Sequence, residues 1–127
     1  MEENSSNFKD ELAEIDKRID DLKNQIEMHH ALERLHENED FKKVVLDGYF
    51  EKESERIFQM LITPSSLKRE QIENLMEMMS SIRYFKGYFK TLIINAAMAP
   101  DELEAEQLYR QEVTAKESID DKTESKG

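Results

Sequence analysis

The clearest pattern in the sequence is a regular apolar stripe near its start. Apolar residues recur at alternating spacings of four and three, and charged residues fill nearly every position between them. On a helix this alternation is the heptad signature of a coiled-coil seam. The seam residues are Phe8, Leu12, Ile15, Ile19, Leu22 and Ile26. The seam predicts an N-terminal segment, residues 1–37, that consists of one long helix beginning near Asn7. Because so narrow a stripe cannot stabilise a helix alone in water, this helix is expected to bind another helix.

The heptad pattern changes after Ile26. The next seam positions are the polar residues His29 and Glu33, while apolar residues such as Leu32 reappear out of phase. This indicates that the seam rotates or passes to a new packing partner. The polar stretch that follows contains Asn38, which can end one helix or cap the next.

Three further helices are predicted over about residues 40–62, 67–98 and 100–112. Gly48 interrupts the first, Pro64 follows it, and a serine at 65 or 66 can cap the second. The second helix carries its own heptad series of Leu75, Met78, Ile82, Phe85, Phe89, Leu92 and Ala96, with extra apolar residues that widen its face. Pro100 suits the first position of the third helix.

The predicted fold is all-α, with three segments. Residues 1–37 form the N-terminal coiled-coil helix, residues 38–112 form a helical hairpin or bundle, and residues 113–127 lack an apolar pattern and form a disordered tail. The seam pairs either with the helix over residues 67–98 or with a second copy. Because the short helix over residues 40–62 cannot cover it, we expect a homo-oligomer.

Composition narrows the class of partner. The chain has 29 acidic and 18 basic residues, a net charge of −11. Both ends are acidic, whereas residues 41–99 are slightly basic, with 7 acids and 9 bases. An acidic chain repels phosphate, which argues against direct binding of nucleic acid or an anionic membrane surface.

The absence of cysteine excludes a thiol nucleophile and a cysteine-ligated zinc site. The acidic N-terminus lacks the pattern of a signal peptide, so we expect a cytoplasmic protein, with the virion as an alternative site.

All three histidines lie within residues 29–36. His29, Glu33 and His36 share one helix face and are candidate metal ligands if a partner supplies another. We favour the simpler interpretation that they are ordinary histidines on a polar, exposed helix end. No phosphate-binding loop and no nucleophile–base pair is present. The sequence therefore predicts no catalytic residue and no cofactor.

Two other stretches combine residue types found at binding surfaces. In residues 83–90, RYFKGYFK, aromatics alternate with bases as in single-stranded nucleic-acid sites, yet Phe85 and Phe89 lie on the heptad series and favour a core role. The methionines cluster at Met60, Met76, Met78, Met79 and Met98. They either fill gaps between helices or form an adaptable groove.

Residues 31–99 contain a series of short motifs that are typical of packing and not of catalysis. These are LERL at residues 32–35, DFK at 40–42, GYF at 48–50, then Glu53 or Glu55 with Arg56, followed by the aromatic pairs at 84–85 and 88–89 and the alanine-rich run at 96–99. In these motifs, residues 31–99 resemble small helical proteins of tailed bacteriophages. The resemblance implies a phage gene product, either a virion component or an assembly factor, and implies no enzymatic activity.

Three functions follow from these observations. The first is a non-enzymatic, oligomeric protein-interaction module that acts in phage structure or assembly. The second is an acidic mimic of DNA that inhibits a host nucleic-acid enzyme, which requires a continuous acidic surface. The third is a metal-binding helical bundle built on the histidines.

Overall fold

The computed structural model describes residues 2–63 and 66–126, with side chains for residues 7–63 and 66–120. Within these residues the secondary structure is helical without a strand, which confirms the all-α prediction. The chain divides into two compact units. The terminal unit consists of the chain up to Met28 and from Ile94 onward, and the hairpin unit is His29–Ile93. No helix in the described part is both long and apolar enough to cross a membrane.

Helix α1, Glu2–Glu37, is the predicted N-terminal helix, but it begins before Asn7. The prediction placed a cap at Asn7, whereas residues 2–6 contain neither proline nor glycine and nothing in them stops the helix. Leu32 is buried and Glu33 is exposed. The apolar face therefore rotates after Ile26, as the change of phase predicted.

Asn38 separates α1 from the next helical segment and caps it. Its side-chain oxygen accepts a hydrogen bond from the backbone N–H of Phe41 at 2.9 Å. Such a bond satisfies one of the free donors at a helix start. The prediction that Asn38 marks this boundary is confirmed.

The segment predicted as one helix over residues 40–62 has three parts. These are α2, Glu39–Phe41, the π-helix η1, Lys42–Glu53, and α3, Ser54–Ile62. Gly48 lies in η1, where a Cβ atom would be 3.0 Å from the carbonyl oxygen of Lys43, five residues earlier. The wider turn brings this oxygen close to Gly48, so a side chain here would require the backbone to shift by a few tenths of an ångström.

The turn between α3 and α4 differs in its capping from the prediction. Helix α3 ends at Ile62, as expected before Pro64, and the Thr63 N–H donates to the Gln59 carbonyl at 3.1 Å. Pro64 and Ser65 lie outside the described residues. Helix α4 begins only at Arg69, so Ser66 does not cap it. Instead, the Gln71 side chain accepts a hydrogen bond from the Lys68 N–H at 2.9 Å.

Helix α4, Arg69–Lys126, contradicts two predictions. It runs through Pro100 without ending, so residues 100–112 are not a separate helix, and it continues through the predicted disordered tail. Proline removes one N–H and crowds the preceding turn, which bends a helix more readily than it ends one when neighbouring residues are packed. Ala96 and Ala99 are buried just before Pro100 and Val113 is buried after it. Packing on both sides of the proline explains why the helix persists.

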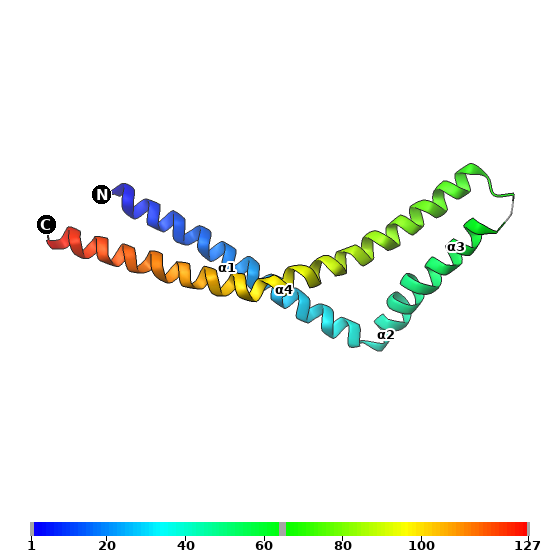
Figure 1. Cartoon of the computed structure of the whole chain (residues 1–127), viewed down its shortest axis with the longest axis horizontal. Coiled ribbons are helices and arrows are strands. Elements are labelled where there is room, and N and C mark those ends of the chain that lie inside the picture. The colour runs from blue at the N-terminus through cyan, green and yellow to red at the C-terminus, as the bar shows by residue number, and fades with distance from the viewer. Residues whose placement is uncertain (1, 64–65, 127) are drawn as a thin grey trace. The chain divides into compact units, whose positions relative to one another are not determined.

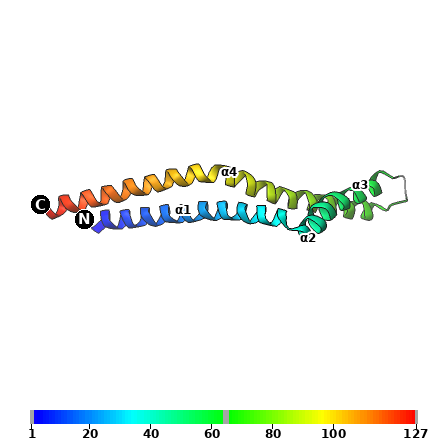
Figure 2. The ribbon, with the colours of Figure 1, turned by 90° about the horizontal axis from the view of Figure 1, so that it is seen from below.

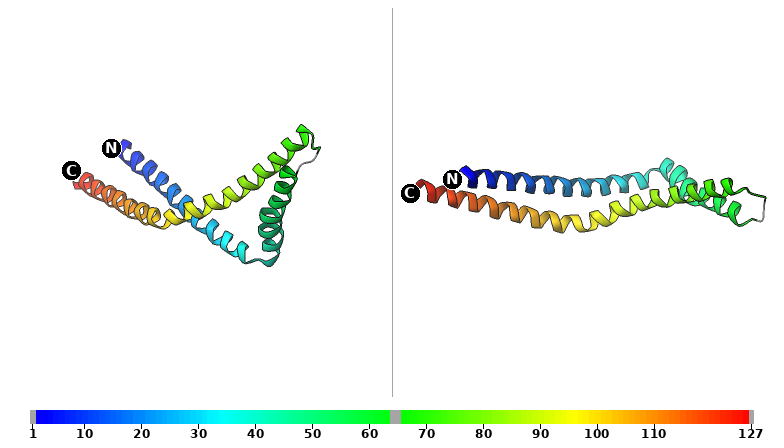
Figure 3. Two further views of the ribbon diagram at one scale, coloured as in Figure 1. Left: turned by 45° about the vertical axis from the view of Figure 1, so that its right-hand side comes forward. Right: turned by 90° about the horizontal axis from the view of Figure 1, so that it is seen from above.

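The core of the hairpin unit lies between η1, α3 and the first half of α4. Phe50 and Ile57 pack there with Leu75 and Ile82. Figure 3 shows α3 folded back beside the start of α4. Aromatic rings extend this core, with the centroids of Phe85 and Phe50 separated by 5.4 Å. Leu75, Ile82 and Phe89 of the predicted heptad series therefore face the hairpin core, whereas Met78 of that series is exposed.

Candidate protein-interaction surface

The predicted partner-binding seam lies in the terminal unit and is covered by the same chain. Figures 1 and 2 show the early part of α1 side by side with the last part of α4. Ile15, Ile19 and Val113 form the buried centre, with Phe8, Leu12 and Leu103 packed against them. Leu22 is also buried, and Ile26 is half-buried. The seam thus pairs with residues 103–113 of the same chain. These residues were predicted to belong to a short helix over residues 100–112 and to the start of a disordered tail.

Val113 was missed although the sequence holds a signal for it. The heptad series of α4 continues in phase beyond Ala96 through Ala99, Leu103 and Val113. Two polar residues, Glu106 and Arg110, occupy core positions of this series and hide its continuation. Because α4 of the same chain covers the α1 seam, this seam no longer favours self-association.

Polar contacts along the seam fix how α1 and α4 align. Arg18 Nε lies 3.1 Å from Glu106 Oε1, and Arg110 Nε lies 2.6 Å from Asp16 Oδ1. The Tyr109 hydroxyl donates a hydrogen bond to the Glu11 carboxylate, and this bond raises the pKa of Tyr109. Because α1 positions rise as α4 positions fall, the two helices are antiparallel.

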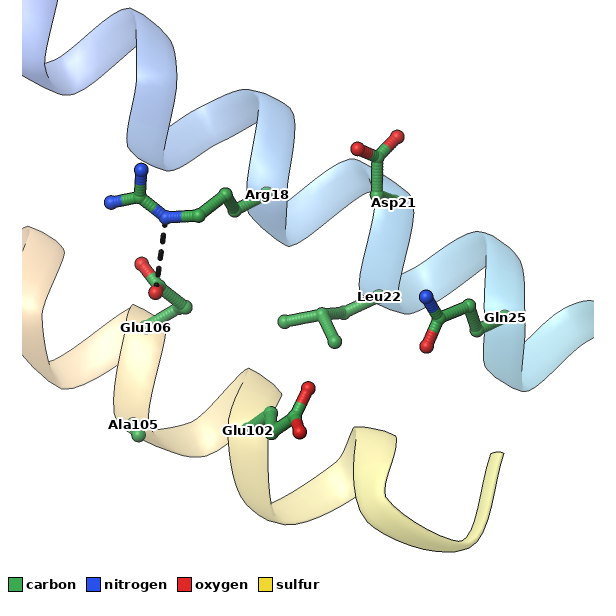
Figure 4. Close-up of a pocket in the computed structure, with 7 residues that line it drawn as sticks. All are labelled: Arg18, Asp21, Leu22, Gln25, Glu102, Ala105 and Glu106. Carbon is green, nitrogen blue, oxygen red and sulfur yellow. Dashed lines mark hydrogen bonds and ion pairs between the residues drawn. The ribbon is translucent and has the colours of Figure 1, made fainter. Parts of the chain in front are cut away.

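One hollow interrupts this seam. Figure 4 shows Leu22 pointing from α1 towards α4, with Arg18 joined to Glu106 beside it. The second carboxylate oxygen of Glu106, Oε2, is buried without a hydrogen-bond partner among the described residues. Glu106 thus forms an ion pair with Arg18 but lowers the stability of the fold locally, because a buried acceptor without a hydrogen-bond donor destabilises the folded state.

In the hairpin unit, large apolar side chains remain exposed on α4. Tyr84 is 69% exposed, Met76 58% and Tyr88 50%. Ile72, Met78, Phe85 and Ile93 are exposed as well. The widened apolar face of this helix was predicted to pack on more than one side. Among the described residues Leu75 and Ile82 of the heptad series are buried in the hairpin core, whereas Met78 and Phe85 of the same series stay partly exposed.

The aromatic–basic stretch at residues 83–90 contributes aromatic rings to the hairpin core and basic side chains to the border of that core. Phe85 and Phe89 join the aromatic cluster, with ring centroids 4.9 Å apart, as the core interpretation predicted. Lys86 Nζ lies 5.5 Å from the Phe50 ring centroid and the Arg83 guanidinium 5.2 Å from that of Tyr84. These bases border the aromatic residues, where their stems and charges stabilise ring contacts.

The clustered methionines line two shallow hollows of the hairpin unit. Met76 and Met79 line one with Leu61, Ser80 and Arg83. Met60 lines the other, at the turn between α3 and α4. Methionine side chains adapt to varied surfaces, so both hollows suit contact with another apolar side chain.

The three metal candidates do not form a metal site. His29 Nδ1 lies 2.9 Å from Glu33 Oε1, whereas His36 Nδ1 lies 2.8 Å from its own-helix carbonyl oxygen at Leu32. The described residues contain no group of three His, Cys, Asp or Glu side chains placed to hold a metal ion. His36 instead packs edge-on against Phe89, with centroids 5.7 Å apart. The ring is thus part of the aromatic packing.

No known protein family, curated protein or solved structure matches this chain.

Proposed function

We propose that this chain is a non-enzymatic protein–protein interaction module that binds through the exposed apolar residues of α4 in the hairpin unit. The observation that supports this proposal is the exposure of Met76, Tyr84 and Tyr88 on a well-packed helix. Contiguous exposed apolar surface on a soluble domain marks a binding site for another molecule. Aromatic and methionine side chains are also the types enriched at the centre of protein interfaces.

The charge of this region indicates the kind of partner. Residues 78–93 contain no acidic residue and three bases, Arg83, Lys86 and Lys90, in a chain with 29 acids. A protein surface that carries carboxylates around apolar side chains complements such a region. The same mixture of bases and exposed apolar residues argues against the DNA-mimic alternative, which requires a continuous acidic surface.

The resemblance of residues 31–99 to tailed-phage proteins adds a finer proposal. The partner is then a phage structural or assembly protein, and the chain acts in the host cytoplasm or in the virion. This part of the proposal rests on the resemblance alone.

Crosslinking at defined positions in the cells that make the protein tests the proposal. A photo-crosslinking amino acid at Tyr88, which is 50% exposed, is expected to capture a specific partner. The same group at Lys17, an exposed position of α1, serves as the control. Replacing Tyr84 and Met76 by serine should abolish capture from Tyr88 while the circular dichroism spectrum stays helical.

Capture that is equal from both positions, or that survives the serine substitutions, contradicts an interface on this face. A captured capsid, portal or tail protein supports the phage assignment. A captured nuclease, polymerase or recombination protein favours the inhibitor alternative instead.

A further inference from the structure

Neither packing nor backbone conformation within the described chain requires a glycine at position 87. It lies in the middle of α4, no described glycine has a positive φ, and a Cβ atom added at Gly87 would meet nothing within 4 Å. Glycine weakens a helix interior relative to alanine. A Cβ atom at Gly48 would crowd the fold, whereas Gly87 borders open space, and a glycine there permits close approach of another backbone or side chain.

Gly87, itself half-buried, lies in a patch of α4 residues in the hairpin unit, which we call the basic patch. The patch consists of Met76, Ser80, Arg83, Gly87 and Lys90, spaced by 4, 3, 4 and 3. This spacing places them on one side of the helix. Neither Arg83 nor Lys90 forms an ion pair with any residue that the structure describes. The patch therefore offers two cations without an ion-pair partner, one on either side of a glycine, although Arg83 also lies over the Tyr84 ring.

The terminal unit carries a complementary patch on the later part of α4, which we call the acidic patch. It consists of Glu104, Leu108, Glu112 and Ala115, all exposed. Leu108 is 54% exposed and sits between the two carboxylates. Neither Glu104 nor Glu112 has an ion-pair partner in the described part of the chain. An apolar side chain flanked by two acids matches a glycine flanked by two bases.

We propose that a second copy of this chain is the partner, and that its acidic patch docks antiparallel on the basic patch. This inference rests on the proposed function and identifies the protein that binds the exposed face of α4 as a second copy of the chain. In this register Leu108 of one copy packs over Gly87 of the other, and Arg83 pairs with Glu112. Lys90 then meets Glu104, and Ser80 meets Ala115. Every charged group that is unpaired in one patch gains an opposite charge in the other.

The antiparallel orientation is the one that allows two copies to form a closed dimer. Soluble homo-oligomers are most often closed two-fold pairs, and a helix related to its copy by a two-fold axis across it runs antiparallel. Antiparallel helices also bring opposite macrodipole ends together. A parallel stagger, in which Arg83 meets Glu104, would instead form an open chain of copies.

Charge reversal tests the pairing of Arg83 with Glu112. Wild-type protein should sediment as a dimer, and R83E and E112R should each weaken dimerisation about tenfold or more because like charges then face each other. An equimolar mixture of R83E and E112R should associate again, since each copy supplies the charge that the other lost. K17E and E55R change the net charge equally at exposed positions outside both patches and should leave dimerisation unchanged.

Gly87→Ala separates this role from a role in folding. At concentrations where the chain is monomeric, G87A should raise the thermal midpoint, because alanine favours the helix. The same substitution should weaken dimerisation about tenfold, since the added methyl group displaces Leu108 of the other copy. A variant that gains stability and loses association cannot be dismissed as misfolded.

Three results would overturn the inference. These are a wild-type chain that stays monomeric, reversals that act no more strongly than K17E and E55R, and a mixture that associates no better than either variant alone. Recovery of R83E by E104R in place of E112R would overturn the antiparallel register. A monomeric chain that still crosslinks from Tyr88 to another protein would refute the second copy and leave the proposed function standing.

Discussion

Val113→Ala measures whether the last part of α4 stabilises the fold. The Val113 side chain is 3% exposed and packs on Ile15 and Ile19. Alanine removes two methyl groups, each worth about 0.8 kcal/mol on burial, and leaves a small cavity between the helices. The expected loss in the free energy of unfolding is therefore about 2 kcal/mol. If residues 113–127 were a disordered tail, the substitution would cost nothing.

Urea unfolding followed by far-ultraviolet circular dichroism provides the measurement. With a slope of about 1–3 kcal/mol per molar urea, a loss of this size lowers the midpoint by about 1 M. The neighbouring Thr114→Ala is the control, because Thr114 is exposed and its hydroxyl bonds only to the Arg110 carbonyl of its own helix. Its effect should stay within about 0.5 kcal/mol. Both variants are compared at one protein concentration, since self-association shifts apparent stability. Equal midpoints for the two variants would refute the packing of Val113 on α1.

Three further substitutions address local features. Gly48→Ala should lower the thermal midpoint, because its Cβ atom would lie 3.0 Å from the Lys43 carbonyl oxygen; an unchanged midpoint would show that η1 relaxes freely. Glu106→Leu should stabilise the chain by about 1 kcal/mol, since it removes a buried acceptor without a donor at the loss of a weak, partly exposed ion pair. The hydrogen bond from Arg56 lowers the pKa of Glu53 below its ordinary 4.5, so this bond stabilises the fold above that pH and is lost as pH falls through the lowered pKa. A carboxyl-carbon NMR titration should show the low midpoint, which Arg56→Gln should return to the ordinary range.

The apolar periodicity was sufficient to predict most of the helical architecture. The alternation from Phe8 to Ile26 identified α1 and its buried face, and the series from Leu75 identified the packed face of α4. Asn38 marked the boundary between α1 and α2 because its short side chain can accept a hydrogen bond from a helix start. These features depend on local spacing and local hydrogen bonds, which a single sequence displays directly.

The features that sequence reasoning missed depend on contacts between distant residues. Pro100 is a helix breaker by local rules, and its tolerance inside α4 depends on the buried alanines before it and on Val113 after it. Glu106 lies in an acidic stretch of the sequence, yet in the structure it occupies a position of the heptad series opposite Arg18. The π-helical turn around Gly48 has no sequence signal stronger than the glycine itself.

The polar pairs of the terminal unit explain why its helices align in one register. Burial alone tolerates a slip of one heptad, because the apolar residues of α1 repeat with that period. A slip in one direction would bring Glu11 opposite Glu106 in place of Arg18, so two acids would face each other. A slip in the other direction would bring Gln25 there and leave the Glu106 charge without a cation. Arg18 is therefore a seam neighbour that favours the observed register. The buried carboxylate oxygen of Glu106 is the cost of that selection, since a leucine at position 106 would not distinguish Arg18 from Glu11 or Gln25.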